Sequence, residues 1–171
     1  MSGAVVTTVP LYSLAMPLAQ REKCQGAGDG VPGIGMRITQ NEFRVSTRGR
    51  TEMVDVTRQV EAAVREAGIR NGEAFVFCPH TTAAITINEN ADPDVVHDVL
   101  LALDEMVPRS NPGFRHSEGN SDAHTKSSLV GCSEQVLIKD GTLVLGTWQA
   151  IYFCEFDGPR SRRVIVQVRG E

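Results

Sequence analysis

The spacing of hydrophobic positions along the 171-residue chain changes several times, and each change marks a new element. Apolar residues at every third or fourth position predict a helix that is capped by Asp55 and ends at Gly68. The same spacing predicts a second helix from Asp92–Pro93 to Pro108, because aspartate caps helices and proline fits the first turn. These are the two main helices that we expect.

Short runs of apolar or alternating residues between turn signals predict strands. The expected strands cover residues 37–47, 73–79, 83–89, 134–139, 142–148, 149–156 and 162–168. The first of these could also be a bent pair of strands. Asp140–Gly141 lies between two of these runs and is typical of a β-hairpin turn. Strands on both sides of two helices indicate an α+β fold, a single domain with a largely antiparallel sheet.

The beginning of the chain lacks such patterns. Residues 20–35 contain five glycines and one proline without periodicity, which is typical of a linker. We therefore expect residues 1–35 to be an N-terminal extension of unknown role and residues 36–171 to form the domain. The first residues have no basic segment, and Pro10 interrupts their apolar run, so a signal peptide is not favoured. We expect a cytoplasmic protein.

Composition narrows the classes of partner. The chain has 17 Lys and Arg against 21 Asp and Glu, a net charge of −4, which argues against nucleic acid or an anionic membrane as the main partner. No apolar run is long enough for a transmembrane helix. The four cysteines are widely separated and form no C-x-x-C motif, so neither a disulfide framework nor a thiolate zinc site is expected.

Two polar blocks carry candidate chemistry, and the first is PHTTAAITINEN, residues 79–90. Alternate residues of a strand share a face. One face would present His80, Thr82, Ala84, Thr86, Asn88 and Asn90. These side chains coordinate or hydrogen-bond, and none is a long charged group, which favours a lined cleft over a half-exposed sheet face. Taken singly, each residue also fits an ordinary exposed sheet face.

The second block is PRSNPGFRHSEGNSDA, residues 108–123, and a helical turn that begins near His124 follows it. Most of the histidines of the chain lie in the two blocks and this turn. Three of the four are found here: His80, His116 and His124. Two or three imidazoles with a carboxylate or water are typical of a zinc-like site, and Glu118 or Asp122 could ligate or orient them. The spacing matches no standard metal motif, so three unrelated loop histidines remain an alternative. His97, on the second helix, is expected to be solvated.

Further residues suit anion or ring binding. Lys126, Ser127 and Ser128 stand in the first turn of a short helix expected near His124, where free backbone N–H groups attract phosphate. An ordinary exposed helix start is the alternative. Trp148 could pack in the core or offer a stacking surface to a heteroaromatic ring, with an amide beside it from Gln149.

The segments HTTAAITINEN, HSEGNSDAHTKSSLVG and SEQVLIKDGTLVLGTWQAI resemble the YjbQ-like family, described as secondary thiamine-phosphate synthases. The resemblance covers about residues 37–169. It implies an α+β fold with a curved antiparallel sheet and a compact homotrimer with polar pockets near subunit interfaces. The apolar content of residues 149–156 exceeds what one sheet face buries and also favours an oligomer.

The resemblance implies that the family's histidines correspond to His80, His116 and His124. It also implies one pocket lined by Asn88, Glu89, Glu118, Asn120, Asp122, Lys126 and Gly146–Gln149. The segment between Glu118 and His124 is short compared with some members, which leaves open which acid faces the pocket. On this basis we expect catalytic roles for His80, Glu118, Asp122, Lys126, Trp148 and Gln149, substrate contacts from Thr82, Asn88, Asn120, Ser127, Ser128 and Thr147, and metal ligation by His80, His116 and His124.

The activity that the resemblance implies is a thiamine-phosphate-synthase-like transfer. A pyrimidine methyl pyrophosphate joins a thiazole phosphate and releases pyrophosphate, so the partner would be a small phosphorylated metabolite. The expected cofactor is a divalent metal ion, Mg²⁺ at the pyrophosphate or a zinc-like ion at the histidines. Because histidines favour zinc-like ions over Mg²⁺, two alternatives remain: a metal-dependent hydrolase and a non-catalytic protein that binds a metal or small metabolite.

Overall fold

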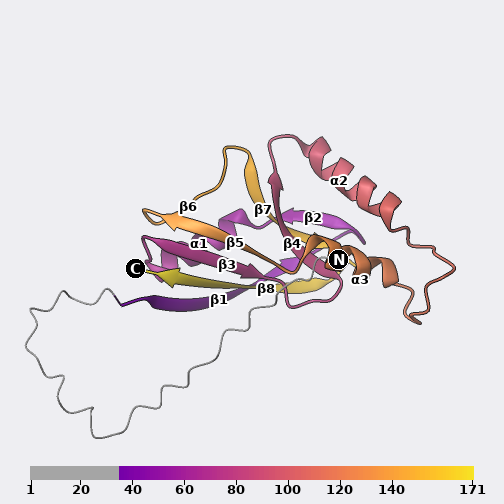
Figure 1. The fold of residues 1–171 in the computed structure, drawn as a ribbon, viewed down its shortest axis with the longest axis horizontal. Helices are drawn as coiled ribbons and strands as arrows, with labels where there is room; N and C mark the ends of the chain where they lie inside the picture. The colour runs from indigo at the N-terminus through magenta and orange to yellow at the C-terminus, as the bar shows by residue number, and fades with distance from the viewer. Residues whose placement is uncertain (1–34) are drawn as a thin grey trace, which may run out of the picture. The chain divides into compact units, whose positions relative to one another are not determined.

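The computed structural model describes residues 35–171, so the expected N-terminal extension lies outside it except for Gly35 (Figure 1). The described residues form eight strands and three helices. In chain order they are β1 (Arg37–Ser46), β2 (Glu52–Asp55), α1 (Thr57–Ala67), β3 (Gly72–Phe77), β4 (Ala83–Glu89), α2 (Pro93–Met106), α3 (Ser121–Val130), β5 (Ser133–Lys139), β6 (Thr142–Leu143), β7 (Gln149–Glu155) and β8 (Ser161–Gly170).

Hydrogen bonds divide the strands into two antiparallel sheets, one ordered β1-β8-β3-β5-β6 and one ordered β2-β7-β4. The expected α+β fold with a curved, largely antiparallel sheet in one domain is confirmed. Three details differ from expectation. Strand β2 was not among the strands expected from the sequence. The short helical turn near His124 is a helix of ten residues, α3. The strand expected over residues 142–148 ends at Leu143, because the following Gly146–Thr147 segment leaves the sheet.

Two hydrophobic clusters hold the elements together. The first joins α1 to both sheets and includes Val60 of α1, Val166 of β8 and Phe153 of β7. The second covers the other face of the three-stranded sheet and includes Tyr152 of β7 and Ala123 of α3, with residues of α2 packed at its edge. Strand β7 is therefore buried on both faces. Its apolar content is explained within one chain and is no longer an argument for an oligomer.

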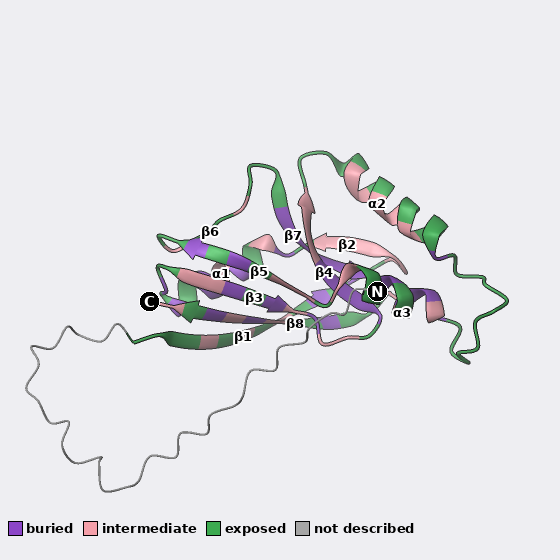
Figure 2. Cartoon of the chain, viewed as in Figure 1, coloured by how far each residue is buried: buried purple, intermediate pink, exposed green. Residues whose placement is uncertain are grey.

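Helix α2 is held differently from α1. Asp92 caps it as expected, since its Oδ1 accepts the N–H of Asp94 at 2.9 Å. None of its residues is buried, whereas α1 buries one face, as Figure 2 shows. Helix α1 ends at Gly68 in the left-handed conformation with φ +60°, as the sequence predicted. No helix within residues 35–171 has the length and apolar content needed to cross a membrane.

Candidate functional site

Strand β4 separates the residues that were expected to share one pocket. His80 and Thr82 precede its first residue, and Asn88 and Glu89 are its last two. Seven residues of extended strand span about 20 Å at roughly 3.3 Å per residue. Within one chain the structure therefore shows two separate groups, one at each end of β4.

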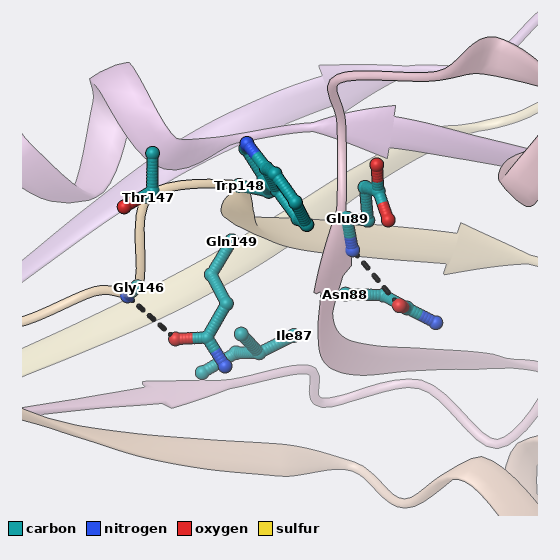
Figure 3. A pocket seen from close by; sticks show the side chains of 7 residues that line it. All are labelled: Ile87, Asn88, Glu89, Gly146, Thr147, Trp148 and Gln149. Atoms are coloured by element: carbon teal, nitrogen blue, oxygen red, sulfur yellow. Dashed lines mark hydrogen bonds between the residues drawn. The ribbon is translucent and has the colours of Figure 1, made fainter.

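The group at the far end of β4 lines a hollow of about 480 Å³ (Figure 3). Its walls come from the end of β4 and from the loop that precedes β7. The lining residues are Ile87, Asn88, Glu89, Gly146, Thr147, Trp148 and Gln149. The register of the sheet brings the two segments together, because Glu89 pairs with Gln149 and Asn88 with Ala150. We refer to this hollow as the Trp148 pocket.

Trp148 is the only tryptophan of the chain and remains 63% exposed. Core packing, one of the two roles considered from the sequence, is thereby excluded. Its backbone carbonyl accepts the N–H of Asn90 at 2.9 Å, which ties the loop to the residue after β4. The indole is thus held at the mouth of a hollow with a large apolar surface open to solvent.

Internal hydrogen bonds orient the two amides of the Trp148 pocket. The Gly146 backbone N–H donates to Gln149 Oε1 at 2.8 Å, and the Gln149 N–H donates to the Gly146 carbonyl at 3.0 Å. The Glu89 N–H donates to Asn88 Oδ1 at 2.8 Å. Because each side-chain oxygen is engaged by an N–H group, the amide NH₂ groups of Asn88 and Gln149 are the ends left to donate.

Close packing supports the turn that presents the tryptophan. A Cβ added at Gly146 would lie 3.2 Å from Gln149 Oε1, tighter than an ordinary contact. A side chain at this position would push the glutamine amide away from the backbone that it bonds. The absence of a side chain at Gly146 therefore helps to hold the Gln149 amide in its orientation.

Glu89 is the only ionisable side chain among the residues that line the Trp148 pocket. Its backbone carbonyl accepts the Tyr152 hydroxyl at 3.0 Å, which fixes the end of β4. The lining contains no lysine, arginine or histidine. The pocket therefore offers two N–H donors, a carboxylate acceptor and an aromatic surface, and it has no cationic side chain for a phosphate.

His80, at the other end of β4, is engaged by the backbone. The Arg163 N–H donates to His80 Nε2 at 3.0 Å, so this nitrogen carries no proton and is not free for a metal. Burial and the nearby Arg162 guanidinium lower the pKa of His80 below its usual value. Arg162 also donates to Thr82 Oγ1 at 2.8 Å. These contacts leave His80 and Thr82 in a structural network.

Lys126 does not face an anion site. It is 1% exposed, and its ammonium donates to the carboxylates of Asp104 and, at 3.3 Å, Asp122. Asp122 also accepts from Arg50 at 3.0 Å. The expected contact between Lys126 and phosphate does not fit this arrangement, because two carboxylates already neutralise the ammonium and bury it.

The other residues expected on α3 also have internal partners. Asn120 donates to Asp157 Oδ2 at 3.1 Å. The Ser127 hydroxyl donates to the Ala83 carbonyl at 2.7 Å, and the Ser128 hydroxyl donates to the His124 carbonyl at 2.9 Å. Each of these three side chains anchors α3 or its neighbours.

His116 and His124 are the two expected metal ligands that the structure brings together. Their rings meet edge to face with centroids 5.3 Å apart. They line a shallow hollow of about 360 Å³ with Phe114, Ser121 and Thr125. The Glu118 carboxylate lies 3.7 Å from His116 Nε2. Among residues 35–171 no cluster of three or more His, Cys, Asp or Glu side chains is arranged to hold a metal ion.

His97 is exposed beside Asp98, 3.0 Å away, as expected for a solvated histidine. The family resemblance had already grouped Glu89 and Gly146 with Asn88 and Trp148, so Ile87 is the lining residue that reasoning from the sequence missed. The β4–β7 register, which pairs Glu89 with Gln149, brings the end of β4 to the Trp148 pocket. The signal available in the sequence was the match of the Gly146–Gln149 block to the family pattern.

Residues 41–171 match the family model described as UPF0047 protein YjbQ-like. The UPF0047 protein YugU of Bacillus subtilis is 55% identical over 128 residues, which cover 75% of this chain and 97% of the relative. The UPF0047 protein MJ1081 of Methanocaldococcus jannaschii is 52% identical over 130 residues, 76% of this chain and 94% of the relative.

Solved structures agree with these relatives. A crystal structure of a YjbQ/UPF0047 family protein from Clostridium acetobutylicum superposes with a TM-score of 0.74 at 53% identity, covering 75% of this chain and 98% of that one. A YbjQ-like protein of unknown function from Sulfolobus solfataricus gives a TM-score of 0.77 at 36% identity, and the match covers 80% of this chain and 100% of that one.

The expectation of a thiamine-phosphate-synthase-like transferase is wrong. The relatives carry the UPF0047 designation of a family without a characterised function, and the Sulfolobus structure is described as a protein of unknown function. The structure gives a physical reason. Lys126, the residue expected to bind pyrophosphate, is buried between carboxylates, and the Trp148 pocket carries Glu89 and no cationic side chain.

Proposed function

The chain belongs to the YjbQ-like UPF0047 family, and on that premise we propose that it binds a small planar molecule in the Trp148 pocket. The observation that carries this proposal is the 63% exposed indole held beside a hollow of about 480 Å³. Large apolar side chains at the mouth of a pocket with a few oriented polar groups are typical of small-molecule sites.

The oriented groups define the chemistry of the ligand. Asn88 and Gln149 each present an NH₂ donor, and Glu89 presents an acceptor. A heteroaromatic ring with carbonyl or ring-nitrogen acceptors or an N–H donor can bond groups of this kind while its face stacks on Trp148. The ligand class that fits is an uncharged or cationic heteroaromatic compound.

Charge disfavours phosphorylated ligands at this place. A unit negative charge 4 Å from the Glu89 carboxylate is repelled by about 1 kcal/mol even at the dielectric constant of water. The lining residues include no cationic side chain to offset the repulsion. We therefore expect the pocket to prefer a neutral or cationic ring to its anionic counterpart.

Binding can be followed with the protein's own fluorophore, because Trp148 is the only tryptophan. The probes are adenine, cytosine and a charge series on one ring: nicotinamide, the 1-methylnicotinamide cation and the nicotinate anion. We expect saturable quenching by at least one neutral or cationic probe and weaker binding of nicotinate. Glu89→Gln should reduce the difference in affinity between the 1-methylnicotinamide cation and the nicotinate anion.

Calorimetry measures how the affinity changes in a pair of matched variants. Stacking on an aromatic side chain contributes about 1–3 kcal/mol, so Trp148→Ala should weaken binding by roughly 5- to 150-fold. Gln59→Ala alters a hollow of similar size, about 460 Å³, that has no aromatic residue, and should leave affinity unchanged. The proposal fails if no probe binds saturably, or if Gln59→Ala loses as much affinity as Trp148→Ala.

A second candidate function is weak binding of a transition-metal ion by His116 and His124. The specific observation is the contact of the two imidazoles next to the Glu118 carboxylate. Two imidazoles with a carboxylate suit zinc-like ions. Since no cluster of three ligands is formed among residues 35–171, water or a bound anion would complete the coordination.

Titration of Co²⁺ into protein without a histidine tag tests this candidate, because its visible spectrum reports imidazole coordination. We expect His124→Ala and His116→Ala each to abolish the spectrum. His97→Ala, which alters an exposed histidine on α2, should retain it. A spectrum that survives His124→Ala, or that His97→Ala also removes, would exclude this site.

A further inference from the structure

Cys78 and Cys132 stand directly opposite each other where β3 and β5 meet. The last pair of the β3–β5 ladder is Phe77 with Ser133. The Cys78 N–H donates to the Cys132 carbonyl at 2.8 Å, which continues this register by one residue. Opposed residues of an antiparallel pair have Cα atoms about 4.5–5.5 Å apart and side chains on one face. Disulfides span about 4.4–6.8 Å between Cα atoms, so the two positions suit a disulfide.

The two thiols differ in their access to solvent. Cys78 is 1% exposed, whereas Cys132 is exposed. Burial raises the pKa of Cys78 to about 11, and Cys132 is one of the neighbouring groups that add to the rise. Because oxidants react with accessible sulfur in its thiolate form, Cys132 is the one that an oxidant in solution meets first.

We propose that Cys78 and Cys132 are a redox-reactive pair that closes into a reversible disulfide when a peroxide reaches Cys132. This inference does not depend on the function of the Trp148 pocket. The two cysteines are 54 positions apart in the sequence (132 − 78), and only the β3–β5 register makes them neighbours.

The chemistry balances in two steps. The Cys132 sulfur attacks one peroxide oxygen, the O–O bond breaks, and the thiol proton leaves with the hydroxide as water, which gives a sulfenic acid. The Cys78 sulfur then attacks the Cys132 sulfur, the S–O bond breaks, and the Cys78 proton leaves with the hydroxide as a second water. Two thiols lose two electrons and the peroxide gains them.

The disulfide would connect three parts of the fold. Cys132 follows Gly131, whose carbonyl accepts the Ile85 N–H of β4 at 3.0 Å. Cys78 is followed by Pro79 and His80, which lead into β4. The bond would therefore fix the start of β5, just after α3, to the segment that carries His80.

Peptide mapping of the full chain tests the pair. Trypsin separates the cysteines, with Cys78 in residues 71–109, Cys132 in 127–139 and Cys154 in 140–160. A Cys24→Ser background removes the remaining thiol. The protein is treated with one equivalent of hydrogen peroxide, alkylated, digested and measured by mass spectrometry with and without reductant. We expect a cross-linked 71–109/127–139 peptide pair that reductant releases, and the loss of two alkylatable thiols per chain.

Variants assign the roles. Cys132→Ser, at an exposed position, should keep the fold and leave Cys78 fully alkylatable after peroxide treatment. Cys78→Ala should divert Cys132 to sulfinic and sulfonic acid. If Cys78→Ala fails to fold, the Cys132→Ser result still decides. Overturning results would be a cross-link to residues 140–160, or irreversible oxidation of Cys132 in the parent protein with Cys78 still free.

Discussion

Replacement of Arg162 by methionine tests how far a buried ion pair stabilises this fold. Glu155 is fully buried and Arg162 is 8% exposed. Arg162 donates to both carboxylate oxygens of Glu155, at 2.7 and 2.6 Å, and to Thr82 Oγ1 at 2.8 Å. Methionine keeps the apolar stem and cannot donate, so the variant leaves the carboxylate without its counter-charge.

The loss of stability in Arg162→Met depends on the hydrogen-bond donors that Glu155 keeps. Removal of one member of a buried ion pair costs about 3–5 kcal/mol. The carboxylate keeps the N–H groups of Phe156 and Asp157 and the Thr47 hydroxyl as donors, which places the cost at the lower end. We expect the free energy of unfolding to fall by about 3 kcal/mol, a large part of the roughly 5–15 kcal/mol of a typical domain.

Urea denaturation followed by circular dichroism at a fixed protein concentration measures this loss. The control is Arg70→Met, because the Arg70–Asp140 pair, 3.2 Å apart, is 73% and 66% exposed. Exposed pairs contribute less than about 1 kcal/mol. A loss of under about 1 kcal/mol in Arg162→Met, or equal losses in both variants, would refute the reasoning.

Three further predictions concern assembly, α3 and pH. We expect the homotrimer that the family resemblance implies, and Phe75 and Leu137, 40% and 64% exposed, leave apolar surface on the five-stranded sheet for subunit contacts. A monomer in sedimentation velocity at micromolar concentration would contradict this expectation. Ser127→Ala should cost about 1 kcal/mol in urea denaturation, because a buried hydroxyl loses its carbonyl partner on β4, while Ser128→Ala at an exposed site should cost clearly less. The pKa of His80 in the folded chain lies below its ordinary value of 6.5, so the unfolded chain binds the proton more readily. The stability that His80 contributes above about pH 6.5 is therefore lost as the pH falls below this value. His80→Gln should flatten that part of the stability curve, and an unchanged slope would contradict the assignment.

Local patterns predicted the elements that face a core. The apolar spacing of α1 and the glycine that ends it are seen in the structure, because periodicity reports which side chains meet apolar neighbours. Helix α3 had no such pattern. It buries Asp122 and Lys126, and Lys126 is neutralised in part by Asp104, 22 residues earlier in the chain. Burial of this kind depends on tertiary partners that no local window contains.

The candidate pocket was predicted in part. The residues named from the sequence or the family resemblance that lie together in the structure are Asn88, Glu89, Gly146, Thr147, Trp148 and Gln149. The histidines were grouped with them, and this grouping does not hold within one chain, because the length of β4 separates its two ends. Alternation along a strand predicts which residues share a face. It does not show whether two residues on that face are close enough to contact the same ligand.

The position of β8 has a consequence for synthesis of the chain. The last strand, Ser161–Gly170, lies between β1 and β3 and pairs with both. Until these ten residues have left the ribosome, β1 has no partner in its sheet and β3 has only β5. The growing chain therefore exposes unpaired strand edges until β8 has been made, which makes it vulnerable to aggregation if translation stalls before Ser161.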